Sequence, residues 1–191
     1  MRGLEGAYLR SADPMVQSGF SAGRERWVAE RSPLVAAFHR DGCFLDVGCA
    51  NGLLAADVVG WARDRGITIE PHGVDLGERL IDLARGRHPG CESNFVVADA
   101  WMWDPPRRWT FVYSLLDLSP PEMWGEWIRR LGSWVEPGGR LIMASYGSRS
   151  RSLEPVDVAE VMKSCGLPVD GSSHGGEPVV TSFAWTEIPI V

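Results

Sequence analysis

Segments that read as strands alternate with helix-compatible segments along most of this chain, and this alternation constrains its fold more than any other feature. The strand segments are residues 43–47, 69–74, 94–98, 110–116 and 140–146, and the first of them is a short apolar run typical of a buried strand. The intervening and following sequence has helical periodicity at residues 53–65, 78–88, 121–135 and 155–165. Alternating strands and helices form a mostly parallel sheet that is covered on both faces. The pattern therefore predicts a doubly wound α/β fold.

The two ends of the chain complete this expectation. Residues 167–171 and 178–186 are interpreted as two final strands that form an antiparallel hairpin at the sheet edge, which gives about seven strands. Residues 1–20 are expected to be irregular, and helices are expected at 22–31, anchored by Trp27, and at 33–40. We expect one domain over residues 1–191, with an N-terminal helical lid segment at 1–40 and the core at 41–191.

Composition excludes several classes of protein. The 191 residues are 45% hydrophobic and carry a formal net charge of −6, which argues against a chain whose main task is gripping nucleic acid phosphates. Four cysteines without a Cys-x-x-Cys pair argue against a zinc site or a disulfide framework, so no metal is expected. Without an apolar run of membrane-spanning length, we expect a soluble cytoplasmic protein with no membrane partner.

The turn after the first expected strand has a distinctive composition. Asp46 is followed by Gly48, Ala50 and Gly52 at every second position, directly before a helix. Small residues let the backbone turn tightly and let a ligand approach closely, and the helix start offers free N–H groups. Ligands of such sheets bind beyond the carboxyl ends of the strands. A turn of this kind also occurs without a ligand, so the turn alone leaves both readings open.

Asp75 ends the second expected strand, 23 positions after Gly52. An acidic side chain at this place can accept two hydrogen bonds from a ribose diol, in NAD and in adenosyl ligands alike. The alternative is a favourable negative charge before a helix. A dinucleotide fingerprint that started at Gly48 would place its last glycine at Leu53, whereas the glycine here is Gly52. The spacing therefore disfavours a dinucleotide.

Four motifs together resemble class I S-adenosylmethionine-dependent methyltransferases. They are residues 44–52, 73–75, 97–100 and 135–141, in the order and spacing of that family, and Ala50 departs from its more frequent glycine. The resemblance implies a small Rossmann-like methyltransferase domain that binds S-adenosyl-L-methionine and releases S-adenosyl-L-homocysteine. It also implies that the last strand inserts next to the fifth strand.

The resemblance implies roles for residues at four strand ends. Asp46 would lie near the methionine ammonium group, Asp75 would bind the ribose hydroxyls, and Asp99 would meet the adenine amino group. Asp117 would border the acceptor and is the candidate catalytic residue. The full cofactor-binding set that the resemblance implies is Asp46, Gly48, Cys49, Ala50, Gly52, Asp75, Leu76, Asp99, Ala100, Trp101 and Leu116.

The acceptor is the least defined part of the sequence-based hypothesis. Asp104-Pro105-Pro106 precedes the fourth strand, whereas nucleobase amino methyltransferases carry a similar motif after it. We expect a small-molecule acceptor, methylated at oxygen or nitrogen, and no nucleic acid partner. An RNA or protein methyltransferase and a non-catalytic protein that binds an adenosyl ligand are the alternatives. Nothing in the sequence indicates an oligomeric state.

The N-terminal segment is expected to act as a lid. No cap domain is inserted between the fifth strand and the last helix, and residues 1–27 have an irregular, glycine-containing composition. We expect this segment to lie over the cofactor and to shape the acceptor pocket.

Overall fold

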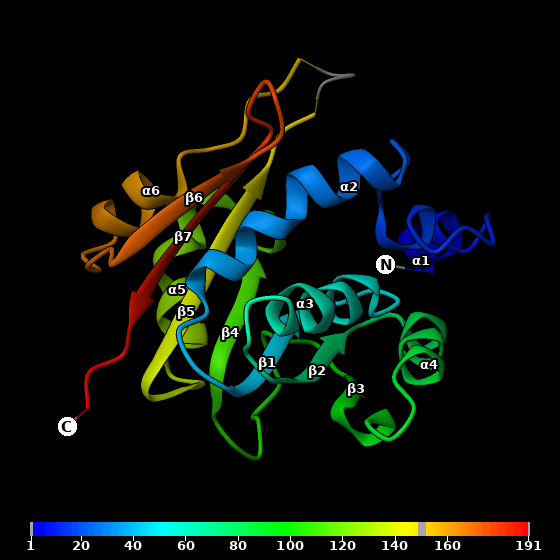
Figure 1. The fold of residues 1–191 in the computed structure, drawn as a ribbon, viewed down its shortest axis with the longest axis horizontal. Helices are drawn as coiled ribbons and strands as arrows, with labels where there is room; N and C mark the ends of the chain where they lie inside the picture. The colour runs from blue at the N-terminus through cyan, green and yellow to red at the C-terminus, as the bar shows by residue number, and fades with distance from the viewer. Residues whose placement is uncertain (1, 149–151, 191) are drawn as a thin grey trace.

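A computed structural model describes residues 2–148 and 152–190, which form a seven-stranded sheet with helices on both faces (Figure 1). The strand order is β3-β2-β1-β4-β5-β7-β6, in which β7 is antiparallel to both of its neighbours. The strands are β1 (Gly42–Val47), β2 (Ile69–Asp75), β3 (Phe95–Val97), β4 (Trp109–Leu115), β5 (Val135–Tyr146), β6 (Gly171–Gly175) and β7 (Thr181–Glu187). This order confirms the predicted doubly wound fold and the insertion of the last strand beside β5.

Two hydrophobic layers hold the helices against the sheet. Side chains alternate along each strand, so that Phe44 faces one layer and Leu45 the other. The first layer contains residues of α2 (Arg24–Arg31), α3 (Leu53–Arg63) and α4 (Glu78–Arg87). The second layer contains residues of α5 (Trp124–Gly132) and α6 (Val158–Ser164). The carboxyl ends of β1, β2 and β4 are therefore framed by helices from both sides.

The N-terminal region is more ordered than its composition predicts. The segment expected to be irregular contains α1 (Arg2–Tyr8) and the 3₁₀ turn η1 (Val16–Ser18), and the expected helix at 33–40 is a 3₁₀ helix, η2 (Ser32–Ala37). Trp27 is buried in the core, as expected. The remaining 3₁₀ turns are η3 (Glu92–Asn94), η4 (Leu116–Leu118) and η5 (Pro121–Met123).

The sixth strand was predicted too early in the chain. It spans Gly171–Gly175 instead of residues 167–171, because Leu167 and Val169 are apolar through packing against the second layer and not through strand formation. The edge strand itself is Gly-Ser-Ser-His-Gly and carries no apolar alternation. β7 starts at Thr181 instead of residue 178, and β5 starts at Val135 instead of residue 140, where its pairing with β4 shifts register.

Within the described part of the chain, the helices are all too short or too polar to cross a membrane.

A substitution at Gly73 in β2 tests how tightly the turn after β1 packs against the sheet. A Cβ on Gly73 would lie 2.6 Å from Cys49 Sγ and 2.8 Å from Phe95 Cδ1. We expect Gly73→Ala to lower the free energy of unfolding by about 1–3 kcal/mol through overpacking. Gly60→Ala, in α3 with open space around it, is the matched control and should raise stability by about 0.5–1 kcal/mol. Urea titration measures both, and a Gly73→Ala variant as stable as the wild type would contradict this packing.

Candidate functional site

The backbone after β1 turns sharply at three small residues. Gly48, Ala50 and Gly52 all have positive φ, at 83°, 47° and 70°. Only glycine adopts this conformation readily, so Ala50 must be held in it by its surroundings. A Cβ on Gly48 would come 2.6 Å from a methyl group of Leu118, whose partly exposed side chain would have to move to admit it. In this turn, at the carboxyl end of β1, Gly48 is exposed and the residues from Cys49 to Gly52 are buried.

Asp75 at the end of β2 holds this turn in place. One of its carboxylate oxygens accepts a hydrogen bond from the Ala50 backbone N–H at 2.9 Å. The other accepts one from the Gly77 backbone N–H at 2.8 Å. The hydrogen bond to Ala50 stabilises the left-handed backbone conformation of this alanine. Each carboxylate oxygen has a further lone pair, so Asp75 can still accept hydrogen bonds from a ligand.

Asp46 is a buried carboxyl group beside this turn. It is 2% exposed and accepts no hydrogen bond from the described residues. Burial, and next the negative charge of Asp75, raise the pKa of Asp46 to about 8. The folded protein therefore retains a proton that the unfolded chain releases near pH 4, so this group reduces stability progressively as the pH rises from about 4 to 8. A cationic ligand group would reverse this effect, because it stabilises the charged form.

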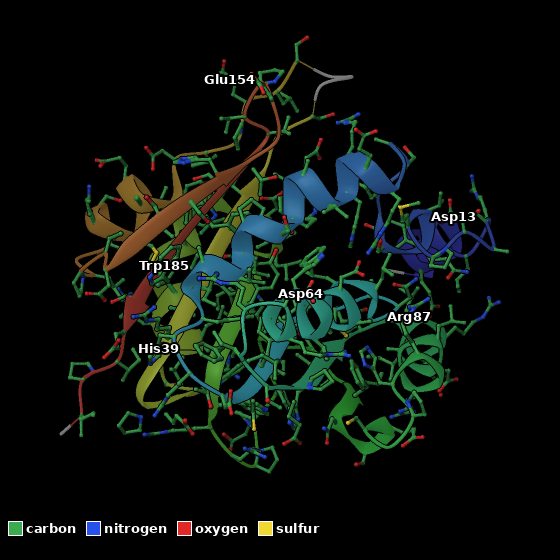
Figure 2. All side chains as sticks on the ribbon, viewed as in Figure 1. Asp13, His39, Asp64, Arg87, Glu154 and Trp185 are labelled. Atoms are coloured by element: carbon green, nitrogen blue, oxygen red, sulfur yellow. The ribbon has the colours of Figure 1, made fainter. Side chains whose placement is uncertain are left out.

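Two residues at the end of α4 support the turn from below. His88 Nε2 lies 3.0 Å from the Gly52 carbonyl, and its ring stacks on Phe95 with centroids 4.5 Å apart. Burial lowers the pKa of His88, so its ring is neutral near pH 7 and does not carry charge at this helix end. Arg87, labelled in Figure 2, donates to the Asn51 carbonyl. α4 therefore fixes the carbonyl side of the turn.

The N-terminal segment reaches the same turn. The Asn51 amide donates hydrogen bonds to the Pro14 carbonyl at 2.8 Å and to Gln17 Oε1 at 3.2 Å. Glu5 accepts a hydrogen bond from the Arg79 backbone N–H at 2.9 Å, at the start of α4. Segments before residue 20 thus touch both the turn and the helix that follows Asp75.

The residues after β2 and β3 form a partly exposed edge next to Asp75. Leu76 is 47% exposed, which is unusual for a leucine beside a buried strand. After β3, Asp99 Oδ1 accepts a hydrogen bond from the Trp101 backbone N–H at 2.9 Å. Ala100 and Trp101 are half-buried, and the Trp101 ring lies 4.8 Å from that of Trp127. The predicted adenine-side residues therefore share one edge of the sheet.

Three predicted residues differ in how they meet this site. The Cys49 side chain is buried against Gly73, and the Leu116 side chain is buried in the second layer. Trp124 Nε1 donates to the Leu116 carbonyl at 3.2 Å. Asp117 is exposed in η4, and the partial loss of surrounding water raises the pKa of its carboxyl group.

Sequence reasoning missed a polar cluster at the ends of β4 and β5. The Tyr113 and Tyr146 hydroxyl groups lie 2.5 Å apart, and the guanidinium carbon of Arg31 lies 3.6 Å from the centre of the Tyr146 ring. Burial raises the pKa of Tyr113 well above its ordinary value. Tyr146 could have been selected because it ends a strand, where ligands of such sheets bind. In the sequence, Tyr113 resembles a core aromatic residue, and Arg31 resembles a solvent-exposed residue of a helix.

The histidines do not gather at these strand ends. His39 lies low in Figure 2, where its ring contacts Phe111. His174 lies in β6. His72 belongs to the single group with metal-ligand spacing among residues 2–148 and 152–190, together with Cys43 and Glu70. His72 Nε2 already contacts Glu70 Oε1 at 3.0 Å, and the group lies away from the carboxyl ends of β1 and β2.

Comparison with known proteins assigns a family to this arrangement. The family described as a methyltransferase domain matches residues 21–175. A search of curated proteins gives no match.

Solved structures share the fold. Magnesium protoporphyrin IX methyltransferase from Synechocystis, with bound SAM, has a TM-score of 0.57 at 18% identity, over 81% of this chain and 74% of that one. 1,6-didemethyltoxoflavin-N1-methyltransferase from Burkholderia thailandensis, with bound 1,6-didemethyltoxoflavin and S-adenosylhomocysteine, has a TM-score of 0.61 at 17% identity, over 86% of this chain and 81% of that one. A putative methyltransferase complexed with the Haloferax volcanii Trm112 activator has a TM-score of 0.63 at 14% identity, over 87% of this chain and 90% of that one.

Proposed function

This chain belongs to the methyltransferase-domain family and is an S-adenosylmethionine-dependent methyltransferase, and we propose that its acceptor is a small molecule, methylated at oxygen or nitrogen. The observation that carries the assignment of its site is the buried carboxyl of Asp46 beside the turn of small residues that follows β1. A buried carboxyl without a hydrogen-bonding partner is costly when charged, and the ammonium group of the cofactor's methionine part would compensate that charge.

The remaining cofactor contacts follow from the neighbouring strand ends. We propose that the backbone of Gly48, Cys49, Ala50 and Gly52 lines the methionine and ribose, since these residues form the turn at the carboxyl end of β1, where ligands of such sheets bind. Asp75 would accept hydrogen bonds from the ribose hydroxyls through its remaining lone pairs. The adenine would lie along the edge formed by Leu76, Asp99, Ala100 and Trp101.

The bound cofactor supplies an electrophilic methyl group on a sulfonium, so the protein's task is mainly positioning and exclusion of water. We propose that Leu116, through its backbone, and Asp117 border the reacting groups after β4. If the acceptor enters protonated, Asp117 is the candidate base, because its raised pKa brings it closer to a working pH near neutrality.

Several features support a small acceptor. The net charge of −6 disfavours nucleic acid, and the names of two structural neighbours indicate porphyrin and toxoflavin precursors as their substrates. An RNA or protein acceptor and a non-catalytic adenosyl-binding role are the alternatives, and steeply salt-dependent RNA binding would favour the first. We also propose a cytoplasmic location, because Cys43, Cys49, Cys91 and Cys165 are all free thiols.

Calorimetric titration with S-adenosylhomocysteine tests the cofactor site. We expect Asp75→Ala to weaken binding by about 1–3 kcal/mol, since it removes charge-assisted hydrogen bonds. Asp64→Ala, at an exposed position after α3, is the matched control and should bind like the wild type. NADH should not bind. Folded wild-type protein that fails to bind S-adenosylhomocysteine, or an Asp75→Ala variant with unchanged affinity, would contradict the proposal.

We further propose that the N-terminal segment is a lid over this site. Its contacts reach the turn through Asn51 and the start of α4 through Glu5, as the lid hypothesis requires. A variant lacking residues 1–19 should keep its fold, measured by circular dichroism, and bind S-adenosylhomocysteine at least about tenfold more weakly, because these contacts preorganise the turn. Full affinity in the truncated protein would refute the lid.

A further inference from the structure

We propose that Arg31 binds a carboxylate group of the acceptor, so that the substrate of this methyltransferase is a small organic acid. The inference rests on the proposed small-molecule function and deepens it. It starts from a buried cation whose hydrogen-bonding capacity is only partly used.

Arg31 is enclosed by aromatic rings at the end of α2. The residue is 7% exposed, and its guanidinium carbon lies 3.6 Å from the centre of the Tyr146 ring. It also lies 5.0 Å from the Phe20 ring centre and 5.3 Å from that of Trp27. Such rings hold the plane of the guanidinium in a fixed orientation and provide some cation–π stabilisation, but they do not satisfy its N–H groups.

Among the residues that the structure describes, only Nη1 of the three Arg31 guanidinium nitrogens has hydrogen-bonding partners. Arg31 Nη1 makes long contacts with Glu30 Oε2 at 3.4 Å and with Thr181 Oγ1 at 3.5 Å. The other oxygen of Glu30 is already bound by Arg26, at 2.7 and 3.0 Å. Two arginines therefore share one carboxylate, which leaves one positive charge uncompensated within this group.

The unused edge of the guanidinium has the geometry that carboxylates prefer. Nε and Nη2 donate to none of the described residues, and neither is sealed from solvent. Two parallel N–H groups on one edge match the two oxygens of a carboxylate in a bidentate pair. A mostly buried charge with its bidentate edge free is expensive to keep unless a ligand uses it.

The position of Arg31 assigns this edge to the acceptor and not to the cofactor. Its contacts lie at Tyr146, the last residue of β5, and at Thr181, which pairs with Tyr146 in β7. In the sheet order, β4 separates β5 from β1, and the residue of β5 in register with Asp46 is Ile142, so Tyr146 lies two strands away from Asp46 and four residues further along β5. Most of the proposed cofactor residues lie on β1 or on its β2 and β3 side, and Leu116, after β4, is the exception.

The surroundings of Tyr146 place Arg31 near the reacting end of the site. The Tyr146 hydroxyl contacts that of Tyr113, which lies beside Asp46 in the strand register. Burial raises the pKa of Tyr146, which also experiences the charges of Arg31, Asp46 and Asp117. The Arg31 edge and the Tyr146 hydroxyl therefore offer donors to an acidic group whose remaining atoms extend toward Asp117.

Binding of benzoate and of its neutral counterpart benzamide tests the proposal, both with and without saturating S-adenosylhomocysteine. We expect the wild type to bind benzoate at least about tenfold more tightly than benzamide, and we expect Arg31→Met to lose this preference. Arg31→Lys keeps the positive charge but lacks the two parallel N–H groups, so it should retain only part of the preference for benzoate. The control variant Arg63→Met removes an exposed charge in the last turn of α3 and should retain the full preference for benzoate.

Three outcomes would overturn the proposal. These are equal binding of benzoate and benzamide to the wild type at tens of millimolar, a preference that survives Arg31→Met, and a folded Arg31→Met variant that has lost S-adenosylhomocysteine binding. The last outcome would assign Arg31 to the cofactor's own carboxylate. Failure of the wild type to bind S-adenosylhomocysteine would instead contradict the proposed function, and the benzoate comparison without cofactor would still test Arg31.

Discussion

The buried carboxyl of Asp46 is the constraint around which this site is organised. It lies on β1, in the interior of the sheet, where burial and the charge of Asp75 disfavour its ionised form. A fold keeps such a group at a cost in stability, and the cost is recovered when a cationic ligand group binds beside it. We propose that such a ligand binds along the turn from Gly48 to Gly52, next to this carboxyl.

The elements around Asp46 act mainly by holding that backbone. Asp75 bonds the Ala50 N–H, His88 contacts the Gly52 carbonyl, and Asn51 ties the turn to the N-terminal segment. The same few residues are thus fixed from β2, from α4 and from the start of the chain. This arrangement explains how Ala50 is kept in a left-handed backbone conformation that glycine would adopt more readily. On the far side of β4, Arg31 carries a second electrostatic imbalance of opposite sign, which we assign to the acceptor.

The sequence predicted the fold well where hydrophobic periodicity was strong and failed where packing determined the outcome. β1 and β4 lie in the interior of the sheet and read as apolar runs, so their positions were predictable. β6 is an exposed edge strand of small and polar residues and gave no periodic signal. In the site, Asp46 and Asp75 follow from motif spacing. Arg31 does not, because only the tertiary structure brings the rings of Phe20, Trp27 and Tyr146 around it.

The proton balance of cofactor binding tests the central role of Asp46 most directly. With a pKa of about 8, its carboxyl carries a proton in about nine of ten unliganded molecules at pH 7. Calorimetry of S-adenosylhomocysteine binding in buffers of different ionisation enthalpy should therefore show release of close to one proton, which Asp46→Asn abolishes. Affinity of the wild type should rise as the pH approaches 8. Binding with no proton release, and equally tight in the Asp46→Asn variant, would contradict this account.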